Sequence, residues 1–129
     1  MAEAAKYRTF CYVLFNFSDT ISVKTYAVKA AISQKKPVVV AFLDFASFDS
    51  SFGKQTWKWS QEEKATVDTA TIFHTACIVG YSDTVNNGSF EIMNSWGGHW
   101  GKDGFIWISY EDLLSLTSVA IAIEEKKQD

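Results

Sequence analysis

The sequence has few of the residues that define several common classes of protein. Its 129 residues include two cysteines, two histidines and one proline. Two cysteines allow at most one bridge, which excludes a scaffold held together by disulfides. At these spacings they fit no zinc pattern with the histidines, and there is no phosphate-binding loop, so we expect no metal and no cofactor. The longest apolar run, 38–43, is far shorter than the roughly 18 residues of a membrane-spanning helix, so no membrane span is expected.

Charge and leader signals are also scarce. The chain carries 12 Lys and Arg against 15 Asp and Glu, a net charge of −3, which argues against a nucleic-acid partner. The N-terminus lacks a basic segment followed by an apolar stretch. We therefore expect no signal peptide, and the sequence leaves the compartment open.

Aromatic residues, in contrast, are abundant. Phe, Tyr and Trp make up 16% of the chain and apolar types 47%, enough to bury a sizeable core and to exclude global disorder. The length suits one compact domain, and neither a linker nor a repeat divides it. We expect residues 1–129 to form a single domain.

The apolar pattern predicts about six strands and one well-formed helix. The strands are expected at 6–17, 37–45, 72–81, 90–94, 105–108 and 117–123. The helix is expected at 22–34, where Val28, Ala31 and Ile32 share one face. Pro37 follows shortly afterwards and stops this helix.

Local signals add three expectations. One or two helical turns are expected at 110–116, with Ser109 as their cap. The polar segment 46–71 is interleaved with aromatics, which favours a long irregular excursion with a short strand near Trp57. The Asn-Gly pair at 87–88 is typical of a tight hairpin turn.

The order of the expected elements indicates the fold class. The strand at 37–45 is apolar on both faces for most of its length, which predicts a central strand covered on both sides. Several successive strands with one main helix predict an α+β fold. It would consist of a mostly antiparallel β-sheet or half-barrel with the helix packed against it.

His74 and Asn94 are the first candidates for chemistry. His74 starts one expected strand, and Asn94, 20 positions later, ends the strand that pairs with it. A hairpin brings its open ends together, so the two side chains can be neighbours. A carboxamide oxygen could then accept from one imidazole nitrogen and leave the other free to face a thiol. The plainer alternative is a half-buried histidine satisfied by any nearby carbonyl. The second histidine, His99, is expected to be exposed in a loop.

Two segments carry a more specific pattern. They are Phe73-His74-Thr75-Ala76-Cys77-Ile78-Val79-Gly80-Tyr81 and Phe90-Glu91-Ile92-Met93-Asn94-Ser95-Trp96-Gly97-Gly98-His99-Trp100-Gly101-Lys102-Asp103-Gly104-Phe105. A His six residues before Gly-Tyr, followed by Asn-Ser-Trp-Gly-x-x-Trp-Gly-x-x-Gly-aromatic, resembles the second half of a papain-like cysteine peptidase. The resemblance extends over about 6–123, and 109–113 is similar to bacterial and archaeal-type members.

The resemblance implies a role for each residue of the motif. It implies that the chain is the C-terminal lobe of such a peptidase, with His74 as the general base and Asn94 as the residue that orients the imidazole. Trp96 would shield the bond between them from water, which otherwise competes for it. Trp100 would be a second indole flanking the cleft. Ala41, Phe73 and Thr75 are candidates for a pocket that receives a substrate side chain.

The nucleophile that the family uses has no counterpart in this sequence. In the family it is a Cys within a Gln-x-x-x-x-x-Cys-x-x-Cys-aromatic stretch of the N-terminal lobe, and that lobe is expected to be absent from this chain. Cys77 is three residues after His74 on a strand, so it points to the opposite face and is expected to be a small buried hydrophobe. Cys11 lies in an apolar strand with no cation nearby and is expected to pack in the core.

Two functions remain open at this point. The first is a C-terminal lobe that contributes base and orienting amide to peptide-bond hydrolysis and is inactive alone because the nucleophile is missing. Its partner is a peptide or protein substrate once the N-terminal lobe completes it. The alternative is a non-catalytic binding module with the same fold. In either case the exposed face for docking the other lobe invites a homodimer or strand exchange.

Overall fold

The computed structural model describes residues 7–65 and 72–127. In chain order the elements are β1 (Tyr7–Val13), α1 (Ile21–Ser33), β2 (Val38–Leu43), α2 (Ala46–Asp49), β3 (Thr56–Trp57), α3 (Gln61–Ala65), β4 (Phe73–Ser82), the 3-10 turn η3 (Val85–Asn87), β5 (Ser89–Met93), β6 (Phe105–Ser109), α4 (Tyr110–Leu116) and β7 (Thr117–Lys127). The six expected strands and the main helix are confirmed. The first strand ends earlier than expected, at Val13.

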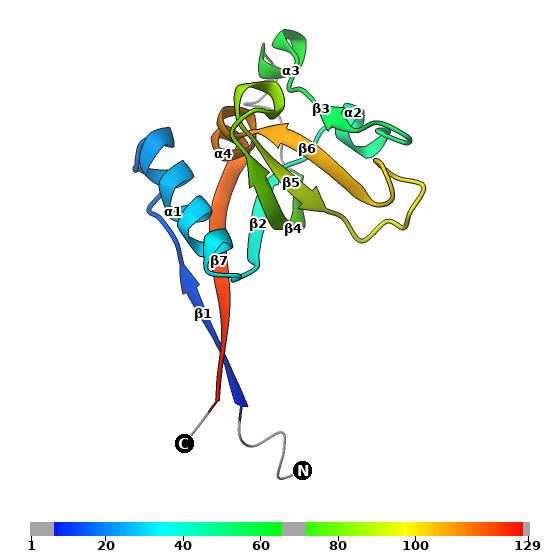
Figure 1. Cartoon of the computed structure of the whole chain (residues 1–129). Coiled ribbons are helices and arrows are strands. Elements are labelled where there is room, and N and C mark those ends of the chain that lie inside the picture. The colour runs from blue at the N-terminus through cyan, green and yellow to red at the C-terminus, as the bar shows by residue number, and fades with distance from the viewer. Residues whose placement is uncertain (1–6, 66–71, 128–129) are drawn as a thin grey trace.

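The strands form one open sheet in the order β1-β7-β2-β4-β5-β6-β3. All neighbouring pairs are antiparallel except β3 and β6, which run parallel. β1 and the far half of β7 extend from the body as a two-stranded ribbon (Figure 1). The expected α+β class with a mostly antiparallel sheet is confirmed.

The helix α1 begins and ends where its sequence signals lie. The Thr20 hydroxyl accepts a hydrogen bond from the Val23 amide at 3.2 Å, which satisfies one of the free donors of the first turn. Val28 and Ala31 bury their side chains in the core. After the helix, Lys35 adopts a positive φ of 61°, and Pro37 prevents a further turn.

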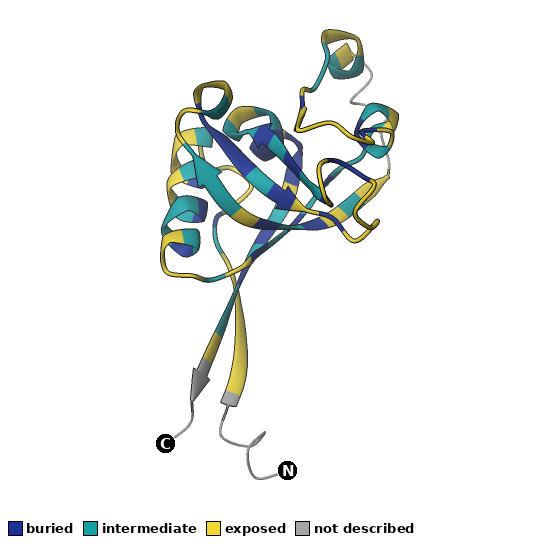
Figure 2. Cartoon of the chain, turned by 45° about the vertical axis from the view of Figure 1, so that its right-hand side comes forward, coloured by how far each residue is buried: buried dark blue, intermediate teal, exposed yellow. Residues whose placement is uncertain are grey.

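The described helices cover one face of the sheet. Along β2, Val38, Val40 and Phe42 are buried, whereas the alternate residues are only partly buried. α1 and α4 contact each other and β2, and the buried residues of Figure 2 concentrate where these helices meet the sheet. Within residues 7–65 and 72–127, the prediction that β2 is covered on both sides is therefore wrong, although the strand is central and apolar on both faces.

Across the described strands, the middle of the side that the helices leave uncovered is continuous and mostly apolar. Val39 pairs with Ile121 of β7 and with Cys77 of β4, and the same row continues to Val13 and Met93. Residues that pair directly across two strands point to the same side of the sheet. This row and the next one along β2, Ala41 with Thr75 and Val119, therefore form one surface. We call it the open face, and it consists of Val13, Val39, Ala41, Thr75, Cys77, Met93, Val119 and Ile121.

The segment after β2 is more ordered than the sequence predicts. The short strand near Trp57 is confirmed as β3, but α2 and α3 were not expected. The Ser47 hydroxyl links all three elements, since it donates to Glu63 at 2.6 Å and accepts from Trp57 Nε1 at 2.8 Å. The last part of this expected excursion, 66–71, lies outside the described residues.

The two turns that frame β5 need unusual backbone angles. Asn86 and Asn87 adopt φ values of 46° and 61° before Gly88, which confirms the expected hairpin between β4 and β5. Between β5 and β6, Gly101 has φ +57°, and a Cβ built there would overlap the Phe105 carbonyl oxygen. Gly101 therefore allows the close approach that folds this loop back on β6.

The Gly101→Ala variant is expected to lose more than about 2 kcal/mol of unfolding free energy, because the added methyl meets backbone rather than a mobile side chain. Gly98→Ala is the matched control, since a Cβ there has nothing within 4 Å, and its change should stay within about 0.5 kcal/mol. Urea unfolding of both variants measures this difference. Equal losses in the two would contradict the account of this loop.

Candidate active site

The candidate site lies where two neighbouring strands end. His74 stands near the start of β4, and Asn94 follows directly after β5. The strands pair antiparallel, which brings these two ends together. His74 Nε2 lies 2.9 Å from Asn94 Oδ1, so the expected proximity of the two side chains is confirmed.

A backbone amide determines which atoms of this pair carry hydrogen. Asn94 Oδ1 also accepts a hydrogen bond from the Ser95 amide at 2.8 Å. A backbone N–H can only donate, so the amide atom that faces it is the oxygen, and the imidazole nitrogen facing the same oxygen must donate. In the neutral ring, the proton of His74 therefore sits on Nε2, and the lone pair of Nδ1 is available to another group.

Asn94 itself is held firmly. Its side chain is only 8% exposed, so the bond it makes to His74 lies largely out of water. Its Nδ2 atom is buried and has no hydrogen-bond partner among residues 7–65 and 72–127. The satisfied atom of this amide is therefore the oxygen shared by Ser95 and His74.

Aromatic rings surround the imidazole. The Trp96 ring lies 4.7 Å from the His74 ring, between centroids, and is 43% exposed. On the other sides, Phe42 and Phe48 lie at 5.6 and 5.7 Å. Trp96, Phe42 and Phe48 thus give the imidazole an aromatic surrounding, and a hydrogen bond in apolar surroundings is stronger than one in water.

Trp100 lies deeper than the sequence suggests. It is fully buried, and its Nε1 donates to the Phe48 carbonyl at 3.0 Å. Its ring meets Trp96 edge-on at 5.8 Å. Instead of flanking a cleft, Trp100 supports Trp96 and Phe48 from within the core, because the tight glycine loop turns it inward.

Of the three residues expected to form a substrate pocket, Ala41 and Thr75 lie on the open face, and the three do not enclose one cavity. Ala41 pairs with Thr75 across β2 and β4, and Phe73 is 56% exposed at the start of β4. Thr75 alone of the three lines a small cavity of about 240 Å³. Its other lining residues are Val39, Ala76, Cys77, Met93, Asn94 and Ser95.

Neither cysteine is placed as a partner for the imidazole. Cys77 lies on the opposite face of β4 from His74, as expected, but it is only partly buried, and burial raises the pKa of its thiol. Cys11 is exposed, so the expectation that it packs in the core is wrong: β1 is an edge strand in the ribbon, beyond the reach of the helices. His99 is exposed in its loop, as predicted.

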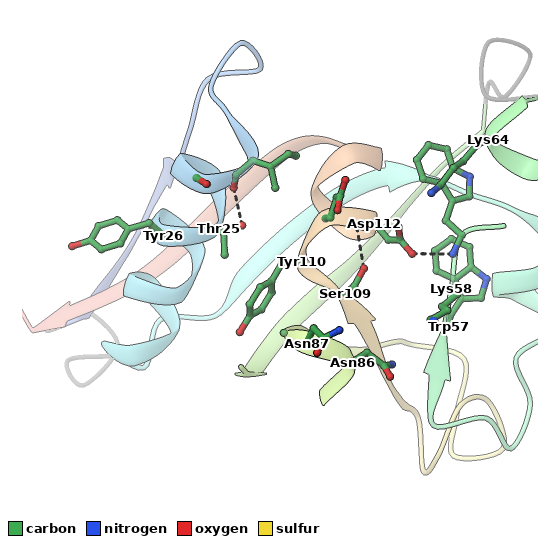
Figure 3. Close-up of a pocket in the computed structure, with 15 residues that line it drawn as sticks. Thr25, Tyr26, Trp57, Lys58, Lys64, Asn86, Asn87, Ser109, Tyr110 and Asp112 are labelled. Carbon is green, nitrogen blue, oxygen red and sulfur yellow. Dashed lines mark hydrogen bonds between the residues drawn. The ribbon is translucent and has the colours of Figure 1, made fainter. Parts of the chain in front are cut away.

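A second, larger cavity lies apart from this site. It measures about 810 Å³ and is bounded by α1, η3, the start of α4 and the segment around β3 (Figure 3). Asp112 lines it: its carboxylate accepts a hydrogen bond from the Trp59 amide at 3.0 Å, and its own backbone amide donates to the Ser109 hydroxyl at 3.2 Å. Sequence reasoning did not single out this groove. It shares no lining residue with the cavity beside Asn94.

No grouping suited to a metal accompanies the site. Among the described residues, no cluster of three or more His, Cys, Asp or Glu side chains could hold an ion. Likewise, no helix within 7–65 and 72–127 is long and apolar enough to cross a membrane.

The stretch that carries this geometry matches a known family. Residues 4–124 match the papain family of cysteine proteases. The chain belongs to this family. An uncharacterized peptidase C1-like protein of Acanthamoeba polyphaga mimivirus is 27% identical over 110 residues, which are 85% of this chain and 34% of that protein. The chain thus spans about one third of the length of the curated relative it matches.

Solved cysteine protease structures share the fold. The clostridial protease Cwp84 after propeptide cleavage is 25% identical with a TM-score of 0.64, covering 95% of this chain and 30% of its own. Xylellain from Xylella fastidiosa is 27% identical with a TM-score of 0.58, covering 76% and 35%. Bromelain from Ananas comosus, in complex with an inhibitor, shows the same fold at 19% identity and a TM-score of 0.58, covering 86% and 47%.

The two thiols of this papain-family chain should differ in reactivity. At mildly alkaline pH an alkylating agent is expected to label Cys11 at least about tenfold faster than Cys77, because burial keeps the Cys77 thiol protonated and covered. Peptide mass spectrometry after timed labelling measures both rates, and Cys11→Ser isolates the slow one. Fast labelling of Cys77 that is lost in His74→Ala would show an imidazole-activated thiol on this chain and contradict the assignment.

Proposed function

We propose that this chain acts as the C-terminal lobe of a papain-family cysteine protease and contributes the general base and the orienting amide for peptide-bond hydrolysis. The observation that carries the proposal is the bond between His74 Nε2 and Asn94 Oδ1, at 2.9 Å. It leaves the second imidazole nitrogen unprotonated and held in place. That is the arrangement a thiol needs in order to lose its proton.

The chemistry follows from the fixed ring. Nδ1 of His74 takes the proton of a cysteine thiol, and the thiolate attacks the peptide carbonyl carbon. The imidazolium then gives its proton to the leaving amine, and a water molecule, activated by the same nitrogen, hydrolyses the thioester. Asn94 keeps the ring oriented while it gains and loses this proton, and Trp96 keeps water from competing for their hydrogen bond.

The nucleophile in this proposal comes from outside the 129 residues. Cys77 lies on the far side of β4 from His74, and Cys11 lies in the ribbon. The chain corresponds to about one third of the relative it matches, which is consistent with a lobe that works beside a second, cysteine-bearing lobe. The chain alone is then inactive.

The open face supports a docking partner of this kind. Its central row, from Val39 to Cys77 and Met93, is apolar, and Met93 is 44% exposed. Monomeric proteins rarely leave such a continuous apolar surface uncovered. The cavity beside Thr75 and Asn94 opens among these residues, so a second lobe would complete both the sheet's cover and the substrate pocket, to which Ala41 and Phe73 would contribute.

A non-catalytic binding module is the alternative function. The open face would serve it equally well, but the site would not. Binding through an apolar surface does not require an amide that sets the tautomer of a histidine or an indole that covers the pair. The His74–Asn94–Trp96 arrangement therefore supports the protease.

Peptide hydrolysis provides the direct test. The isolated chain is expected to show no turnover, because it holds no thiol at Nδ1, and adding a papain-family N-terminal lobe that bears the cysteine is expected to produce turnover. In that pair His74→Ala abolishes activity, and Asn94→Ala lowers kcat about a hundredfold by releasing the ring.

His99→Ala is the matched control for these variants and should leave the rate unchanged, since that imidazole lies exposed in the loop. Turnover by the isolated chain that an alkylating agent blocks and His74→Ala removes would overturn the assignment of the nucleophile. A complex between the two lobes that binds peptide without cleaving it would favour the binding module.

The open face also predicts self-association of the isolated chain. Sedimentation equilibrium at rising concentration is expected to show a dimer, because pairing two apolar faces removes both from water. Val39→Lys places a charge at the centre of this face and should shift the chain to monomer. Tyr26→Lys is the control, because Tyr26 is 77% exposed on α1 and its replacement should not matter. A monomer at every concentration would contradict this prediction.

A further inference from the structure

Two carboxyl groups next to the site lack the donors they need. Asp44 follows β2, and Asp49 ends α2. Each has one oxygen, Oδ1, that is buried with no hydrogen-bond donor among the described residues. The two side chains lie within hydrogen-bond reach of each other. Two ionised carboxylates cannot satisfy one another, but one shared proton turns one of them into a donor and satisfies both.

The surroundings favour that proton. Burial comes first among the causes that raise the pKa of Asp44 to about 7, followed by the hydrogen bond and the charge of Asp49. The Phe45 amide donates to Asp44 and acts in the opposite direction. Two carboxylates this close together in a partly buried place repel each other, which favours the state in which one of them is protonated.

This pair joins the two segments whose phenyl rings contact the His74 ring, the end of β2 and α2. Asp44 lies two residues after Phe42, which pairs with His74 in the sheet. Asp49 directly follows Phe48, whose ring contacts His74. A bond between the two carboxyl groups therefore ties the end of β2 to the helix turn that carries Phe48.

The helix turn is short, and its other anchors are the Ser47 hydroxyl, which bonds Glu63 and Trp57, and the Phe48 carbonyl, which accepts from Trp100 Nε1. α2 has four residues, and Phe48 is its buried one. That single ring contacts His74, Trp96 and Trp100 at 5.7, 6.1 and 4.9 Å. A small displacement of α2 thus reaches the rings that hold the imidazole.

We propose that Asp44 and Asp49 share one proton, and that this acid pair positions Phe48 beneath the His74 ring for as long as the proton is present. When the pair is fully ionised, the two charges repel and α2 moves. The contribution to stability is complete at acidic pH and is lost as the pH rises through neutrality, because the folded state holds this proton more tightly than the unfolded chain. Only the catalytic consequence rests on the proposed function.

Other titratable groups around α2 are already engaged or lie on other elements. From α3, Glu63 accepts from the Ser47 hydroxyl at 2.6 Å and from the Ser60 hydroxyl at 3.0 Å. From β4, His74 meets Phe48 through its ring. Lys54 follows α2 in the loop, where its amide bonds the Ser51 carbonyl. The test must therefore separate the effect of Asp44 on Phe48 from that of His74, whose ring contacts Phe48 directly.

Carbon-13 NMR of the whole chain makes that separation. The Asp44 carboxyl signal is expected to titrate with a midpoint near pH 7, and the Phe48 ring signals should shift with the same midpoint. Asp44→Asn gives Asp49 a permanent amide donor, so the Phe48 shift should disappear while the ring stays in its acidic-pH position. In His74→Gln the Phe48 shift should persist.

Two further variants keep the test decisive. Asp49→Asn should act like Asp44→Asn if the latter fails to fold, and Asp103→Asn makes the same chemical change at an exposed loop position and should alter nothing. An Asp44 midpoint near that of an exposed carboxyl, about 4, would overturn the shared proton. An Asp44 midpoint near neutrality without any Phe48 shift would overturn the positioning role.

Activity supplies an independent readout. If the two-lobe protease is active, Asp44→Asn should extend its activity to higher pH and leave the rate at acidic pH unchanged. The NMR titration needs no turnover, so an inactive complex would count against the proposed function and leave the acid pair standing.

Discussion

One oxygen atom, Asn94 Oδ1, sets the chemistry that the site can perform. It accepts from the Ser95 amide and from the His74 imidazole, and the first of these donors cannot titrate or rotate away. The orientation of the amide follows from the chain itself, and the tautomer of the histidine follows from the amide. A neutral carboxamide can thus hold the ring in one state without a fixed negative charge, so His74 Nδ1 stays free to take up and release a proton.

The rest of the structure holds His74 and Asn94 at hydrogen-bond distance and packs apolar rings around them. β4 and β5 meet at their ends because their alternate residues, such as Ile78 and Ile92, are buried on one face. Below the imidazole, Phe48 depends on a helix turn of four residues. The pairing of β4 and β5 therefore sets the distance between the two side chains, whereas α2 sets the packing of Phe48 against the imidazole. Under our proposal, a movement of α2 therefore changes the site.

The sequence predicts the elements that have a local pattern. It does not predict those that depend on contacts between distant parts of the chain. The helix α1, the strands and the turn at Gly88 each have a local cause, as does the approach of His74 to Asn94. α2 and α3 are too short to show a period, and bonds made through Ser47 hold them. Burial of Cys11 was predicted from its apolar neighbours, but it depends on what lies over β1. Trp100 turned inward for a similar reason, since its direction comes from the glycine loop.

The error about β2 is informative in itself. Its sequence is apolar on both faces, a pattern typical of a strand buried on both, yet the described helices cover one. Under the proposed function, a second lobe seated on Val39 and Cys77 supplies the missing cover of this face. The strand's sequence then describes the assembled enzyme rather than the lone chain. A binding module would explain the open face but would leave the prepared nitrogen of His74 without a purpose.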